Sequence, residues 1–167
     1  MEKKILIAYG TVAGSTKDVA QAIGEEIKNA GVQVEIKPVE DVKSLVGYDG
    51  VIVGSAVRMF HLLGKTRRFL HKHRKALTKV PLAFFVVCLT MGEETTENIE
   101  KAKGYAKPML DVKDPVSLGL FGGCIDHDKL TDIFGKSMKS VPEQDHRDWD
   151  KIRAWGRETL TKLLKEA

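Results

Sequence analysis

The stretch from Tyr9 to Ala20 places two glycines and three hydroxyl side chains at a single junction of the chain. An apolar run, residues 5–8, precedes it, and a segment with apolar residues at helical spacing follows it. A loop of this kind between a strand and a helix offers backbone N–H groups, hydroxyl donors and the positive end of a helix dipole. These groups suit a small anion, and phosphate best of all.

The surrounding residues argue against four common phosphate-binding folds. A P-loop needs Gly-Lys-Ser/Thr, whereas the lysine here, Lys17, falls three residues after Gly14. A dinucleotide fold needs G-x-G-x-x-G, but only Gly10 and Gly14 are present, and Glu40 alone is a weak ribose-binding acid. A cysteine phosphatase needs a cysteine at the head of the loop, and a receiver domain needs an aspartate after the central strand; neither is found.

What remains is a loop that binds a phosphomonoester through neutral donors, namely the hydroxyls of Thr11, Ser15 and Thr16 and the N–H groups between them. The alternative is an ordinary tight turn in which Ser15 or Thr16 caps the following helix. Both interpretations stay open on the residues alone.

The elements that must position this loop alternate along the chain. Strands are expected at residues 4–9, 32–39, 50–57, 81–89 and 116–121, and helices at 16–30, 64–77, 95–110 and 148–165. A turn is expected at 42–45, and residues 124–147 carry no clear pattern. This alternation predicts an α/β protein with a parallel sheet covered on both faces. Because ligands of such sheets bind outside the carboxyl ends of the strands, functional residues should follow Tyr9, Gly54, Cys88 and Phe121.

The segment from Ile7 to Thr16, with Ala20 and Ile23 in the helix behind it, resembles the flavodoxin signature. Ala8 departs from it, because a larger apolar residue is usual there. The resemblance implies a doubly wound, five-stranded parallel sheet in the order 2-1-3-4-5, formed by one domain over residues 1–167.

The same resemblance implies a cofactor, since flavodoxins bind flavin mononucleotide (FMN). Residues 11–16 would hold its phosphate, residues 55–60 one side of its ring system, and residues 89–92 the other. Arg58 is either a cation near the N1–C2 end of the ring or a surface ion pair. The candidate cofactor-binding residues are Thr11, Val12, Ala13, Gly14, Ser15, Thr16, Ser55, Ala56, Val57, Arg58, Met59, Phe60, Leu89, Thr90, Met91 and Gly92.

The charge of the chain separates two branches of the family. Electron-carrier flavodoxins are usually acidic, whereas this chain has a formal net charge of +4. Residues 54–61 and 147–152 look more like the quinone-dependent protoporphyrinogen oxidases of flavodoxin type. The shared FMN site predicts electron transfer through non-covalent FMN. The alternative is an oxidoreductase of the second type, which acts on a quinone or a porphyrinogen. Whether the protein is a carrier or an enzyme stays open.

In that second branch, an insertion before the last helix reaches the membrane. The matching stretch here, residues 126–139, is short and has four apolar residues at helical spacing: Leu130, Ile133, Phe134 and Met138. A surface helix with peripheral membrane contact and a segment packed in the core both stay open.

Residues 65–79 are strongly basic, as on a solvated helix face or a docking surface for an acidic redox partner. Nucleic acid is not expected, because no recognition motif accompanies these charges. Cys88 and Cys124 are expected to be buried free thiols, and His127 and His146 solvated side chains, with no metal site. The chain shows no signal peptide and no run long enough to cross a bilayer, which favours a cytoplasmic protein.

Overall fold

The computed structural model describes residues 2–129 and 138–167. A parallel sheet forms its centre, with the main strands in the spatial order β2-β1-β3-β5-β6. Counted along the chain, this is the predicted order 2-1-3-4-5. The strands are β1 (Lys4–Gly10), β2 (Gln33–Pro38), β3 (Gly50–Arg58), β5 (Leu82–Cys88) and β6 (Leu118–Gly122), with the short β4 (His61–Leu62) antiparallel to the end of β3.

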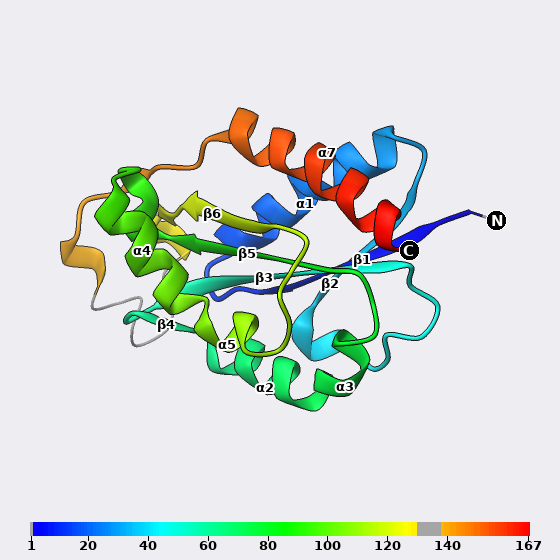
Figure 1. Ribbon diagram of the computed structural model, residues 1–167. Helices are drawn as coiled ribbons and strands as arrows, with labels where there is room; N and C mark the ends of the chain where they lie inside the picture. Colours follow the sequence, from blue (N-terminus) through cyan, green and yellow to red (C-terminus); the bar gives the residue numbers. More distant parts are fainter. Residues whose placement is uncertain (1, 130–137) are drawn as a thin grey trace.

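Helices cover both faces of this sheet (Figure 1). One face carries α1 (Ser15–Asn29) and α7 (Trp149–Glu166), and the other carries α2 (Gly64–Lys72), α3 (Arg74–Leu77) and α5 (Lys107–Leu110). Each face has its own apolar core, because alternate residues of the central strands point to opposite sides. The helix α4 (Thr96–Tyr105) contacts β6 and the 3-10 turn η2 (Leu89–Gly92).

Two of the predicted helices are interrupted. The basic helix expected at 64–77 is broken at His73, whose buried ring lies 4.8 Å from that of Phe69 and whose φ is −102°. The helix expected at 95–110 is broken at Ala106, just before Pro108, which removes a backbone donor near the start of α5. The turn expected at 42–45 lies slightly earlier, as the 3-10 turn η1 (Val39–Asp41).

The unassigned segment after β6 forms a small two-stranded sheet of β7 (Cys124–Ile125) and β8 (Gln144–Asp145), with 3-10 turns η3 (His127–Lys129) and η4 (Met138–Ser140). The apolar positions 130, 133 and 134 lie outside the described residues, and so does the question of a surface helix there. Within the described ranges, no helix combines the length and apolarity that a membrane crossing requires.

Candidate functional site

The carboxyl ends of the parallel strands meet at one edge of the sheet, at the left of Figure 1. Register aligns these ends, since Gly10 of β1 is paired with Ser55 of β3, and Cys88 of β5 with Gly122 of β6. The loop after β1, the tip after β3 and the η2 turn after β5 therefore come to the same edge, as the sequence predicted.

The loop after β1 is shaped by its own backbone. Gly14 is the N-cap residue of α1 and has φ +92°, a left-handed conformation that glycine adopts without strain. The Gly14 N–H donates to Oγ1 of Thr11 over 2.9 Å, which leaves the Thr11 hydroxyl proton free to be donated. No side chain caps α1, so the interpretation of Ser15 or Thr16 as an ordinary cap is wrong.

Thr16 is the most informative side chain of this loop. It is fully buried in the first turn of α1, yet its Oγ1 has no hydrogen-bond partner among the described residues. An unsatisfied buried polar group costs about 1–3 kcal/mol, so such a hydroxyl calls for an explanation. A phosphate at the start of the helix would supply the missing acceptor, and the donor set therefore fits one.

The start of the loop after β1 packs closely against Thr66 of α2. A Cβ on Gly10 would lie 2.1 Å from Oγ1 of Thr66, so only glycine fits where β1 meets α2. Ser55 donates its hydroxyl proton to the carbonyl oxygen of Ala56 over 2.8 Å, so the 2.9 Å bond between Ser55 and Thr66 has Thr66 as donor. Ser55 is thus fully buried and satisfied, and its hydroxyl supports the edge rather than facing a ligand.

The tip after β3 is strained and apolar. Arg58 and His61 face each other across a two-residue turn whose central residues, Met59 and Phe60, have φ values of 50° and 67°. Hairpin turns with positive φ at both central residues strongly prefer Asn-Gly, because large side chains are disfavoured there. Met59 and Phe60 are nevertheless 68% and 73% exposed, so neither burial nor turn preference explains these residue types.

The η2 turn after β5 forms the facing side of the site. Leu89 is 38% exposed, whereas Met91 is only 4% exposed and packs against Ala102 in a small core cluster. Of the predicted ring-binding residues on this turn, Met91 therefore serves the core. The turn borders a cavity of about 690 Å³ lined by Phe60, Leu89, Thr90, Gly92, Glu93, Asn98, Lys101, Tyr105, Gln144 and His146.

Several lining residues were not found from the sequence. The ring of Tyr105 lies 6.1 Å from that of Phe60, and its hydroxyl lies 3.3 Å from Oγ1 of Thr90. His146 is exposed, as expected of a solvated side chain, but one side of its ring also lies against Gly92, where an added Cβ would lie 3.0 Å from the ring atoms. The only indication in the sequence that His146 could line a site was its place in the segment that follows β6. Sequence periodicity does not predict that a residue of this segment contacts η2.

The segment that carries His146 has contacts within itself and an ion pair to α1. Nε2 of His146 lies 2.6 Å from Oε1 of Gln144. Arg147 forms ion pairs with Asp145 at 2.7 Å and with Asp18, in the first turn of α1, at 3.1 Å. The guanidinium holds the pKa of Asp145 below its usual range, and these carboxylates raise the pKa of Arg147. The chain after β8 is thereby tied to α1, the helix that follows the loop after β1.

Other candidate residues lie apart from this edge chemistry. His127 contacts Glu143 and the carbonyl oxygen of Val141 instead of lining the cavity. Both cysteines are free; Cys88 is buried, while Cys124 is only partly buried, so the prediction of two buried thiols is half wrong. Burial raises the pKa of both thiols. The described residues contain no group of three His, Cys, Asp or Glu side chains placed to hold a metal ion.

Residues 6–148 match a family model described as a flavodoxin domain. The chain is 28% identical over 109 residues to protoporphyrinogen IX dehydrogenase (quinone) of Escherichia coli K12, which covers 64% of this chain and 60% of that protein. A protein of the same name from Leishmania major is 24% identical over 166 residues, covering 90% of this chain and 71% of that protein. The match to the E. coli relative thus spans less than two thirds of its length.

Solved structures agree on the fold. A flavodoxin from the domain Archaea superposes with a TM-score of 0.58 at 22% identity, covering 96% of this chain and 99% of that one. Oxidised flavodoxin 2 from Bacillus cereus superposes with a TM-score of 0.60 at 20% identity, covering 95% and 99%. At such identities the likeness shows the fold alone.

Proposed function

The chain belongs to the flavodoxin domain family, and from that premise we propose that it transfers electrons through FMN held non-covalently at the carboxyl edge of its sheet. FMN is the cofactor that the family implies. In this proposal, residues 1–167 form one FMN-binding domain, and the protein acts in the cytoplasm. One observation carries the proposal. The loop after β1, with the unpartnered Thr16 hydroxyl, and the exposed apolar tip after β3 lie at the same carboxyl edge of the sheet.

The two ends of the site would divide the work of binding. The hydroxyls of Thr11 and Thr16 and the N–H groups of residues 12, 13, 15 and 16 would hold the phosphate, aided by the dipole of α1, while the Gly14 N–H stays bonded to Thr11. Met59 and Phe60 would contact one side of the ring system, and Leu89, Thr90 and Gly92 the other. When bound, the flavin supplies the redox chemistry, accepting and giving up electrons at this edge.

The direct experiment is purification with added FMN. The protein should be yellow, and denaturation should release unmodified FMN in a stoichiometry of one per chain. A protein that binds NAD tightly and takes up no FMN at micromolar concentration would contradict the proposal.

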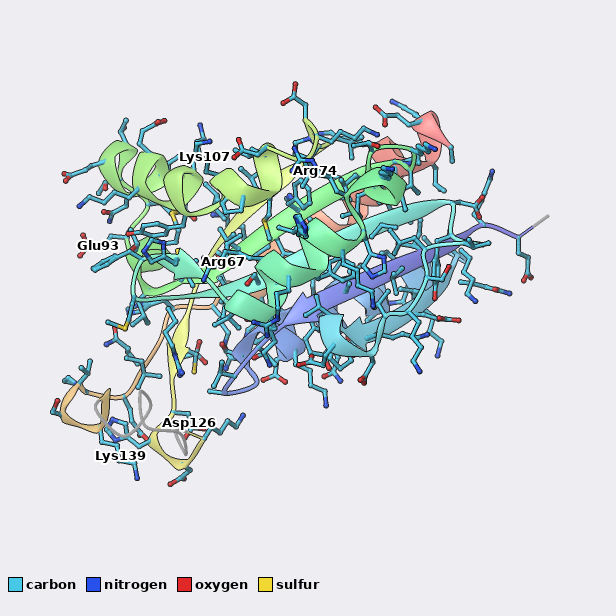
Figure 2. All side chains as sticks on the ribbon, turned by 90° about the horizontal axis from the view of Figure 1, so that it is seen from below. Arg67, Arg74, Glu93, Lys107, Asp126 and Lys139 are labelled. Carbon is cyan, nitrogen blue, oxygen red and sulfur yellow. The ribbon has the colours of Figure 1, made fainter. Side chains whose placement is uncertain are left out.

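The finer identity of the partner rests on charge. The outer face of α2 and α3 carries exposed cations, among them Arg67, Arg68, Lys72 and Arg74, and Figure 2 shows Arg67 and Arg74 on that face. This docking face (Arg67, Arg68, Lys72, Arg74 and Lys75) follows the hairpin tip directly in the chain and suits an acidic redox protein. Within this proposal the partner is such a protein.

A second candidate function is favoured by the cavity beside the tip. Its volume of about 690 Å³ could admit a small molecule next to the flavin, and relatives from E. coli and Leishmania are named as quinone-dependent protoporphyrinogen dehydrogenases. In this alternative the protein is an FMN-dependent oxidoreductase that acts on a porphyrinogen with a quinone as acceptor. Anaerobic mixing of the FMN-loaded protein with protoporphyrinogen, followed by addition of a quinone, distinguishes the two: flavin bleaching and recovery support the enzyme, and an unchanged spectrum supports the carrier.

A further inference from the structure

One lysine of the basic segment turns away from the docking face. Lys65, in the first turn of α2, donates from Nζ to the backbone carbonyl oxygen of Thr11 over 2.8 Å. Its Nζ also lies 3.1 Å from Oε2 of Glu40 in η1. The ammonium group is therefore attached to the first residue of the phosphate loop.

The protons of this ammonium group can be counted. A lysine ammonium has three N–H donors and no acceptor. One goes to Thr11 and one to Glu40, and the third has no partner among the described residues. The side chain is 29% exposed, so this third donor is open to a ligand that arrives at the loop.

Glu40 makes the position of this lysine matter more. Its carboxylate is a negative charge close to a loop that would receive an anion, and its field reaches β1, since burial and then Glu40 and Asp41 raise the pKa of Tyr9. Without a cation between them, Glu40 and a phosphate would repel each other. Lys65 lies at that position, bonded to the loop on one side and to the carboxylate on the other.

We propose that Lys65 and Glu40 form an opposed charge pair that sets how strongly this site prefers a phosphate-bearing flavin over one without phosphate. Lys65 attracts the phosphate and supplies a third N–H donor, and Glu40 limits that attraction. The sequence predicted only neutral donors for this loop. The structure adds a cationic donor, Lys65 of α2. The inference rests on the proposed function, because it concerns the same phosphate end.

The test compares FMN with riboflavin, which has the same ring system and no phosphate. Dissociation constants are measured by flavin fluorescence quenching at low salt and at about 0.5 M salt, where exposed charges are screened. The variants are Lys65→Met, which keeps the apolar stem, Lys65→Arg, which keeps the charge, and Glu40→Gln. Lys162→Met, at an exposed lysine on α7, is the matched control.

The pair predicts effects of opposite sign. Because both groups are partly exposed, the changes are modest: Lys65→Met should weaken FMN about fivefold and Glu40→Gln should tighten it about twofold at low salt. Lys65→Arg should stay near the parent, and the Lys162 control should leave the affinity for FMN unchanged. Riboflavin binding should not respond to any of the four.

Three results would overturn the inference. Equal losses for FMN and riboflavin in Lys65→Met would mean that Lys65 only braces the Thr11 carbonyl. An FMN affinity that does not respond to Lys65→Met or to salt would mean that its charge is not sensed by the phosphate. A parent protein that binds neither flavin would remove the proposed function itself, and that outcome is distinct from the other two because it appears before any variant is compared.

Discussion

The proposed phosphate end and the proposed ring end of this site are built in opposite ways. At the phosphate end, Thr11, Gly14 and Thr16 lie within six consecutive residues, and the backbone turn and start of α1 place them. At the ring end, Phe60, Tyr105 and His146 come from three separate parts of the chain and meet only through packing. A local motif thus sets one end, and tertiary structure sets the other.

The two ends also differ in how they affect stability without a ligand. At the phosphate end, the loss of stability comes from a buried group, because the Thr16 hydroxyl has no hydrogen-bond partner among the described residues. At the ring end, the loss of stability comes from the surface, because Met59 and Phe60 are exposed and have positive φ values. Both costs are expected where binding, rather than folding, explains the residues.

The largest effect should follow from replacing Met59 and Phe60 with Asn and Gly, which suit a turn with two positive φ values. Relief of strain should raise the free energy of unfolding by about 1–2 kcal/mol. Loss of two apolar contacts should weaken FMN and riboflavin alike, by about thirtyfold. Chemical denaturation and flavin titration measure the two effects.

Val46 provides the control for this variant, because it is 89% exposed and apolar but lies in the loop before β3, at the opposite edge of the sheet. Val46→Asn should leave flavin affinity unchanged. Unaltered flavin affinity in the double substitution at the tip would show that Met59 and Phe60 do not contact the ring.

A smaller and more selective effect is expected at the phosphate end. Thr16→Ala removes one charge-assisted hydrogen bond, so FMN should bind about tenfold more weakly while riboflavin is unaffected. Thr159, on α7, also has a buried Oγ1 without a partner among the described residues, and Thr159→Ala is a matched control that should spare both ligands. Equal losses of FMN and riboflavin in Thr16→Ala would contradict phosphate recognition.

The contrast explains how much could be predicted from the sequence. The spacing of Gly14 and Thr16 after a buried strand was enough to predict the loop between β1 and α1, because that loop is made by neighbouring residues. That this loop binds a phosphate stays a prediction. The strand order could be predicted from the family resemblance, because alternating strands and helices leave few arrangements.

The rest depended on contacts between distant residues. Met59 and Phe60 were recognised as ring-binding candidates, but neither is a turn residue, so the strained hairpin gave no local signal. His146 could not be placed, because the absence of a Cβ on Gly92 matters only once the two segments meet. Lys65 was counted with the basic face, since only the fold turns it toward Thr11.

The smallest effect on either end should come from the docking face. Reversing Arg67, Arg68 and Lys72 to Glu should leave flavin affinity and stability nearly unchanged, because exposed charges contribute little to folding. Electron transfer with an acidic partner should slow, and its rate in the parent should fall with salt as the screening length shrinks from about 10 Å at 0.1 M to 3 Å at 1 M. Stopped-flow kinetics at several ionic strengths measure this.

Reversal of Lys28, Lys162 and Lys165, which lie on α1 and α7 across the sheet, is the control of equal charge change. That variant should keep the rate of the parent. A rate independent of salt in the parent and in both triple variants would mean that the α2–α3 face is only solvated surface.

The central claim is that this edge of the sheet binds one ligand by two different ends, a phosphate and a flavin ring. Titration of the flavin-free parent protein with FMN, riboflavin and NAD tests it most directly. The account predicts that FMN binds tightest, that riboflavin binds at least about tenfold more weakly because it lacks the phosphate contacts, and that NAD does not compete. Equal affinities for FMN and riboflavin, or tight binding of NAD without binding of FMN, would contradict it.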